Sequence, residues 1–126
     1  MIVGLGIDLV PIERAAGLLE RHGERFLARC FAPGEVARRG DPAHLAGLLA
    51  AKEAAFKALG TGWGQGVGWR DVEVTRDGAG APALALHGAA ATRAQALGGA
   101  RSHVSITHDG GLAVAVVVLD APAHAA

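Results

Sequence analysis

The segment LAGLLAAKEAAFKAL, residues 45–59, constrains the fold most, because a helix of this composition is apolar on nearly every side. Such a helix is stable only when other parts of the protein cover it. Asp41 before Pro42 is a favourable helix start, and Gly60 is a favourable helix end. We therefore expect a largely buried helix over residues 43–59.

Three charged side chains, Lys52, Glu53 and Lys57, interrupt this apolar segment, and they include the only two lysines of the chain. Glu53 and Lys57 stand four residues apart, and on an exposed helix such an ion pair contributes only ~0.2–0.5 kcal/mol. In a buried helix, charged groups need a partner or a ligand. The pattern therefore favours a functional site over a surface ion pair.

The N-terminal stretch IVGLGIDLV, residues 2–10, predicts a strand on which Asp8 shares one face with Gly4 and Gly6. The two missing side chains leave room for another group to come close to this carboxylate. Asp8 and Glu53, with water and phosphate oxygens, are a plausible ligand set for Mg²⁺. Lys57 and a glycine-rich stretch from residue 60 to residue 68 suit a phosphate-bearing ligand, although the glycine spacing matches neither common phosphate-binding motif.

The rest of the chain predicts a single α+β domain over residues 1–126, with an antiparallel sheet packed against helices. A helical segment begins after Pro11, and Arg14, Arg21 and Arg25 lie on its side away from the core. Two hairpins are expected, one over residues 71–75 and 82–88 and one over residues 102–108 and 111–119, with a short helix over residues 89–98 between them.

Composition excludes several classes of protein. The formal net charge is zero, which argues against a nucleic-acid partner. The longest strongly apolar run has nine residues, far short of the ~20 that a membrane-spanning helix needs. The N-terminus has no signal-peptide pattern, and a single cysteine, Cys30, cannot form an internal disulfide, so we expect a cytoplasmic protein.

Three motifs resemble those of one enzyme family. GIDLVPIERA near the start, AAKEAAFKALGTG in the middle and HVSITHDGGLAVAVVVL near the end occur in the order and spacing of the holo-acyl-carrier-protein synthases, the small 4′-phosphopantetheinyl transferases of bacterial fatty-acid synthesis. The resemblance covers the whole chain. It implies transfer of the 4′-phosphopantetheine arm of coenzyme A to a serine of apo acyl carrier protein, with release of adenosine 3′,5′-bisphosphate, by a Mg²⁺-dependent homotrimer.

The resemblance also implies roles for individual residues. Asp8 and Glu53 would hold the magnesium ion, and Lys57 would neutralise the phosphates of the coenzyme. Lys52 would pair with Asp8 or cap the site. Coenzyme contacts would come from Gly60, Thr61, Gly62 and His103, and contacts to the carrier protein from Arg14, Arg21 and Arg25. The base that removes the serine proton would be Glu53 or a metal-bound water that Glu53 orients.

The chain departs from the family pattern at two positions. Leu48 stands where the family usually has an arginine, and Ala81 stands where it often has a lysine, so two cations near the coenzyme are missing. Arg70 and Arg101 are candidate substitutes. Among the other prominent side chains, we expect His108 to be structural and Trp63 and Trp69 to serve packing rather than to stack on adenine.

Two other functions remain open at this point. A Mg²⁺-dependent nucleotide pyrophosphatase could use the same carboxylates and lysine, and it would hydrolyse coenzyme A without any carrier protein. A coenzyme A-binding trimer without transfer activity would bind the ligand and form no product, and Leu48 and Ala81 are the residues that suggest it.

Overall fold

The computed structural model describes residues 1–37, 40–61 and 66–123 of the 126-residue chain. The expected α+β class is confirmed. In chain order the elements are β1 (Ile2–Pro11), α1 (Ile12–His22), α2 (Glu24–Cys30), the 3₁₀ turn η1 (Pro33–Glu35), α3 (Pro42–Leu59), the 3₁₀ turn η2 (Trp69–Asp71), β2 (Val72–Arg76), β3 (Pro82–Leu86), α4 (Gly88–Ala96), β4 (Arg101–Asp109) and β5 (Leu112–Asp120).

The predicted buried helix is α3, and both of its predicted ends are confirmed. The Asp41 carboxylate accepts hydrogen bonds from the backbone N–H groups of Ala43 and His44, at 3.1 and 3.3 Å. Gly60 ends the helix in the left-handed conformation, with φ of +74°. Between residues 45 and 59 every residue is buried except Glu53 and Lys57. Within this stretch, two of the three charged groups that the sequence marks, Glu53 and Lys57, therefore reach the surface, and Lys52 does not.

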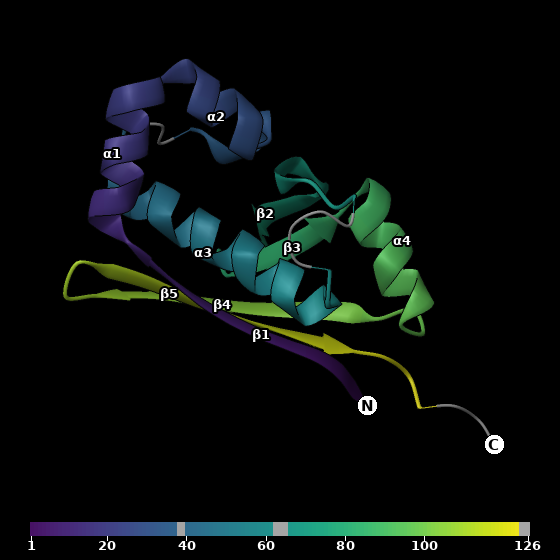
Figure 1. Ribbon diagram of the computed structural model, residues 1–126. Coiled ribbons are helices and arrows are strands. Elements are labelled where there is room, and N and C mark those ends of the chain that lie inside the picture. The colour runs from purple at the N-terminus through teal and green to yellow at the C-terminus, as the bar shows by residue number, and fades with distance from the viewer. Residues whose placement is uncertain (38–39, 62–65, 124–126) are drawn as a thin grey trace.

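Helix α3 lies across one face of a three-stranded antiparallel sheet of order β1-β5-β4 (Figure 1). Its closest approach is to β1, at the two glycines that flank Asp8 along one strand face. A Cβ atom on Gly6 or Gly4 would collide with the backbone carbonyl groups of Ala54 or Ala58 in α3. The space that the sequence predicts beside Asp8 is thus filled by the protein's own helix. The glycines bring β1 close enough to α3 for Asp8 to meet Lys57.

The far end of α3 is fixed to the sheet by His108. Its Nε2–H donates to the carbonyl oxygen of Ala43 at 2.9 Å, and Gly47 leaves room for the imidazole ring. The expected structural role of His108 is confirmed.

The helical segment after Pro11 is broken into α1 and α2 at Gly23, which has φ of +50°. The two helices turn back over α3 (Figure 1). Phe26, Leu27 and Cys30 of α2 enter the core, and Ala15 is the buried residue of α1. The break at Gly23 means that the arginines predicted as one stripe come from two helices.

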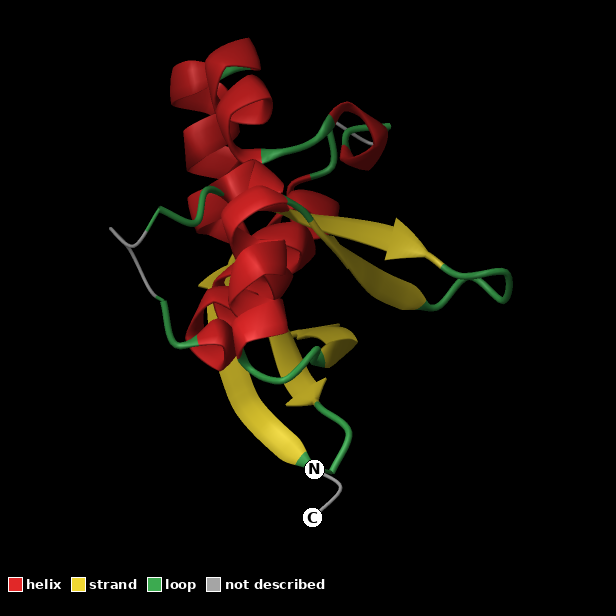
Figure 2. Cartoon of the chain, turned by 90° about the vertical axis from the view of Figure 1, so that its right-hand side faces the viewer, coloured by secondary structure: helices red, strands yellow, loops and turns green. Residues whose placement is uncertain are grey.

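Of the remaining elements, β2 contacts the middle of α3 at Lys52, and α4 contacts its C-terminal end at Leu59. Strands β2 and β3 pair as a hairpin that projects away from the larger sheet (Figure 2). Within the described residues, no helix combines the length and apolarity that crossing a bilayer requires.

Candidate active site

Strand β1 and helix α3 place Lys57 directly against Asp8. The Lys57 ammonium donates to Oδ1 of Asp8 at 3.0 Å and to the carbonyl oxygen of Ile7 at 3.0 Å. The lysine side chain is 56 % exposed, whereas that of Asp8 is only 12 % exposed. The Lys57 ammonium is therefore accessible from solvent and can contact a ligand, while the Asp8 carboxylate is largely covered.

Glu53 lies one helical turn before Lys57 on the same side of α3, and it forms a carboxylate pair with Asp8. Burial, a side-chain hydrogen bond with Asp8 and the negative charge of Asp8 raise the pKa of Glu53 to about 7, although Arg14 and Lys57 oppose the shift. Among the described residues, Oδ2 of Asp8 is buried and accepts no hydrogen bond in the structure. A proton or a cation shared by the two carboxylates would relieve the repulsion between them.

This pair fits a magnesium ion. Two carboxylates with an unsatisfied oxygen are the donors that Mg²⁺ takes from a protein when substrate phosphates and water complete its shell. Within the described part of the chain, no cluster of three or more histidine, cysteine, aspartate or glutamate side chains suits a metal. That donor set fits a metal shared with a substrate better than a closed structural site.

Lys52 points away from this pair, so both expected roles for it are wrong. Its ammonium donates to Oε1 of Glu35 at 2.8 Å and to the backbone carbonyls of Trp69 and Val72. Both side chains of the Lys52–Glu35 ion pair have no exposed surface. Burial lowers the pKa of Lys52, and Glu35 counteracts that effect. The geometric reason is that Lys52 and Glu53 are adjacent in a helix, so they project about 100° apart.

Glu35 is the residue that the sequence did not reveal. It accepts hydrogen bonds from the backbone N–H groups of Ala32 (2.7 Å) and Val74 (2.8 Å) as well as from Lys52. It thereby ties η1, α3 and β2 together. The one signal in the sequence is that a lysine in an all-apolar helix needs a buried anion, and that signal does not say where in the chain the anion lies.

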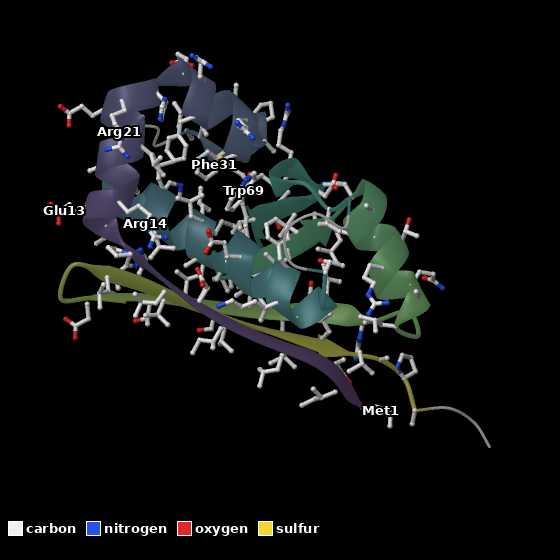
Figure 3. The ribbon with its side chains drawn as sticks, in the orientation of Figure 1. Met1, Glu13, Arg14, Arg21, Phe31 and Trp69 are labelled. Carbon is white, nitrogen blue, oxygen red and sulfur yellow. The ribbon has the colours of Figure 1, made fainter. Side chains whose placement is uncertain are left out.

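A pocket of about 440 Å³ opens beside Glu53, between α1, α2, α3 and η2. Arg14 and Arg25 are exposed as expected, and both line this pocket. Arg21 is also exposed but is not part of the pocket lining. Figure 3 shows Arg14 and Arg21 on α1, with Arg14 nearer to the sheet. Arg14 is the arginine that acts on the charge of Glu53.

The structure does not bring the predicted coenzyme-binding residues to one place. Thr61 is buried, and both its hydroxyl and its backbone N–H donate to the carbonyl oxygen of Phe56, at 3.4 and 3.2 Å. Gly62 and Trp63 lie outside the described residues. His103 of β4 pairs with Val118 of β5, and its side chain lies on the sheet face opposite to α3 and Asp8. Within one chain, His103 therefore does not face the carboxylate pair.

The positions that depart from the family pattern are equally separated. Leu48 is 3 % exposed and belongs to the core, so an arginine at this position would be buried. Ala81 lies at the exposed turn between β2 and β3, where its N–H donates to Asp77 at 3.0 Å. Arg70 and Arg101 are exposed, and Arg101 lies 3.7 Å from Asp120.

Trp69 is half-buried and packs against the core, as expected. Its ring meets that of Phe56 edge-on, with the ring centroids 5.4 Å apart. It also forms one wall of the pocket beside Glu53.

Comparison with known proteins gives one consistent result. The family model of the 4′-phosphopantetheinyl transferase superfamily matches residues 4–117. The holo-[acyl-carrier-protein] synthase of Nitratidesulfovibrio vulgaris (strain DP4) is 54 % identical over 123 residues, which is 95 % of this chain and 99 % of the relative.

Two solved structures have the same fold. The crystal structure of the Helicobacter pylori holo-[acyl-carrier-protein] synthase with coenzyme A is 32 % identical and gives a TM-score of 0.81 over 92 % of this chain and 99 % of that one. The synthase of Bacillus anthracis, also in complex with the coenzyme, is 35 % identical, with a TM-score of 0.78 over 97 % and 99 % of the two chains. The chain belongs to the 4′-phosphopantetheinyl transferase superfamily and, within it, to the holo-[acyl-carrier-protein] synthases.

Proposed function

We propose that this protein transfers the 4′-phosphopantetheine arm of coenzyme A to a serine hydroxyl of apo acyl carrier protein, in fatty-acid biosynthesis in the cytoplasm. The observation that carries the proposal is the Asp8–Glu53 carboxylate pair beside the exposed Lys57 ammonium. Its family membership and the coenzyme complexes of its relatives support the choice of donor.

The reaction is a phosphoryl transfer, in which catalysis consists mainly of positioning and charge stabilisation. The serine oxygen forms a bond to the pyrophosphate phosphorus that bears the pantetheine arm. The bond from that phosphorus to the bridging oxygen breaks, and adenosine 3′,5′-bisphosphate leaves with the electron pair. The serine proton passes to a base, either Glu53 or a water that Glu53 orients.

Asp8 and Glu53 would hold Mg²⁺, which when bound supplies positive charge to the pyrophosphate oxygens. Lys57 is placed to add a second positive charge on the solvent side of the same carboxylates, where a phosphate would enter. An ammonium is a compact point charge that suits a phosphate oxygen. The backbone at Gly60 and Thr61 would approach the coenzyme.

We also propose that the protein is a homotrimer. The sheet face opposite to α3 carries large exposed side chains of β1, with Leu5, Ile7 and Leu9 64 %, 61 % and 48 % exposed. An apolar sheet face of this kind is a candidate for burial between subunits. His103 lies on this same face. Any contact that it makes with the coenzyme would therefore be at the site of another subunit.

The carrier protein would dock on Arg14, Arg21 and Arg25. Acyl carrier proteins are acidic, and the three arginines are exposed. Two of them also line the pocket beside Glu53, so a carrier bound there would bring its serine to the carboxylate pair.

The competing functions are separated by one experiment. The protein is incubated with coenzyme A and Mg²⁺, with and without apo acyl carrier protein, and adenosine 3′,5′-bisphosphate is measured by chromatography. The proposal predicts release only when the carrier is present. Release without carrier would support a pyrophosphatase, and coenzyme binding with no release would support a binding protein.

A further inference from the structure

The pocket beside Glu53 combines two kinds of side chain that the transfer reaction does not by itself require. Its interior is apolar, formed by Val10, Leu18, Phe26, Cys30, Leu49 and Trp69. Four of these six, those other than Leu18 and Trp69, are buried. Its rim carries the basic side chains of Arg14, His22, Arg25 and Arg29, all of them exposed, and the half-buried Glu53 completes the lining. Apolar and charged groups are therefore segregated by depth.

The polar side chains of the lining are almost all ionisable. None of the lining residues within the described part of the chain has an amide or hydroxyl side chain. Ligand pockets usually fix orientation through a few such groups in an apolar lining. Besides the indole N–H of Trp69, the side chains here that can fix a polar group are the ionisable ones. The body of a matching ligand is hydrocarbon, and its polar part is an anion.

The rim arginines are available for such an anion. Among the described residues, none of Arg14, Arg25 and Arg29 has a carboxylate within ion-pair distance. A planar guanidinium matches a carboxylate with two parallel hydrogen bonds. The volume of about 440 Å³ lies toward the small end of ligand pockets, which suits one aliphatic chain rather than a two-chain lipid.

We propose that this pocket is a binding site for a single-chain anionic amphiphile, an aliphatic chain of medium length that ends in a carboxylate. The chain lies on the apolar interior, and the carboxylate pairs with the guanidinium groups at the rim. A bound molecule covers Arg14 and Arg25 and lies against Glu53. Occupancy therefore competes with the carrier protein, a consequence that rests on the proposed function, whereas binding itself does not.

The test is calorimetric titration of the metal-free protein with decanoate, with neither coenzyme nor carrier present. We expect one saturable site. Octanoate should bind about tenfold more weakly, because each buried methylene group contributes roughly 0.8 kcal/mol and two are lost. Decanol and decyltrimethylammonium, which have the same chain with a neutral or a cationic head, should bind at least about tenfold more weakly than decanoate.

Two charge-reversal variants locate the site. Arg29 lies on the pocket rim and is not one of the proposed catalytic or docking residues. The variant Arg29→Glu should weaken decanoate binding at least about tenfold. Arg21→Glu changes the same charge outside the pocket lining and should leave the affinity within about twofold. Equal effects of the two variants, absence of saturable binding, or equal affinity for decanol would each overturn the proposal.

Transfer kinetics then test the competition. Decanoate should raise the KM for the carrier protein and leave the KM for coenzyme A unchanged. If the protein shows no transfer, the proposed function fails while the titration still decides the pocket. If transfer proceeds but decanoate does not bind, the pocket proposal alone fails.

Discussion

The Lys57 ammonium lies 3.0 Å from Oδ1 of Asp8 and connects the exposed side of α3 to the first strand of the sheet. The two residues are 49 positions apart, and they meet because Gly4 and Gly6 let β1 approach the backbone of α3. The catalytic charges of the proposed mechanism therefore depend on two glycines that touch no substrate.

Replacement of Lys57 tests its role in charge stabilisation. Lys57→Met should lower kcat by about 100-fold, the scale on which one preorganised donor to a developing charge acts. Lys57→Arg keeps the charge but not the compact ammonium, and it should recover only part of the loss. Steady-state kinetics with both substrates check this, and a kcat within twofold of wild type for Lys57→Met would exclude Lys57 from the chemical step.

Glu53 should make the stability of the metal-free protein depend on pH. The pKa of Glu53 is about 7 in the folded protein and 4.5 as the ordinary value, so the protonated form favours folding. The stabilisation is complete below pH 4.5 and is lost as the pH rises through 7. Thermal unfolding in EDTA should therefore show a melting temperature that falls between pH 5.5 and pH 8.

Glu53→Gln is the matched variant for this effect. It should reduce the pH dependence of melting and abolish transfer while leaving the protein folded, because an amide neither repels Asp8 nor holds a metal well. Magnesium should raise the melting temperature of the wild type at pH 8 and have little effect on the variant. An unchanged pH profile in Glu53→Gln would show that another group titrates.

The Lys52–Glu35 pair should contribute to the free energy of unfolding and should not change the charge at the active site. Lys52→Met or Glu35→Gln alone leaves one charge unpaired in the core, and each should cost about 3–5 kcal/mol of unfolding free energy. The double variant Lys52→Met with Glu35→Gln leaves no unpaired charge, so it should be closer to wild type than the sum of the single changes. Urea unfolding of the four proteins checks this, and additive losses would contradict it.

The close approach of β1 to α3 can be tested with a single methyl group. Gly6→Ala places a Cβ against the carbonyl group of Ala54 and should destabilise the protein by about 1–3 kcal/mol, with loss of activity as β1 moves. Gly78→Ala, at the β2–β3 turn with no atom within 4 Å of the added methyl group, is the control and should be close to neutral. Equal stability of the two variants would contradict the packing described for β1.

The arginines of α1 should affect the KM for the carrier protein far more than the KM for coenzyme A, although Arg14 also acts on the charge of Glu53. Arg14→Glu combined with Arg21→Glu should raise the KM for acyl carrier protein at least about tenfold and leave that for coenzyme A within about twofold. The wild-type KM for the carrier should also rise with salt, because the contact is between exposed charges. An equal change in both KM values would remove the docking surface.

The features of this protein that depend on local sequence signals could be predicted from the sequence. Helix α3 is predictable at both ends because Asp41 and Gly60 act on the backbone beside them, and its burial follows from its apolar composition. The Asp8–Glu53 pair could be predicted because each residue stands out in its local sequence. Asp8 shares a strand face with two glycines, and Glu53 lies in an apolar helix.

The unpredicted features depend on contacts between distant segments. Glu35 contacts Lys52 only after η1, α3 and β2 have packed together. No residue pattern near Glu35 in the sequence predicts that contact. The sequence alone does not show whether His103 and Asp8 lie on the same face of the sheet, because that depends on how β4 and β1 pair with β5. Arg25 lines the same pocket as Arg14 although the two lie on different sides of the break at Gly23, and no local signal in the sequence indicates this.

The most direct test of the central claim is the intact mass of an apo acyl carrier protein after incubation with this protein, coenzyme A and Mg²⁺. We predict that the carrier gains the mass of one phosphopantetheine arm, that EDTA prevents the gain, and that Glu53→Gln gives none. A carrier of unchanged mass with the wild-type protein would contradict the proposed transfer, and a full gain with Glu53→Gln would contradict the assignment of Glu53 to the metal.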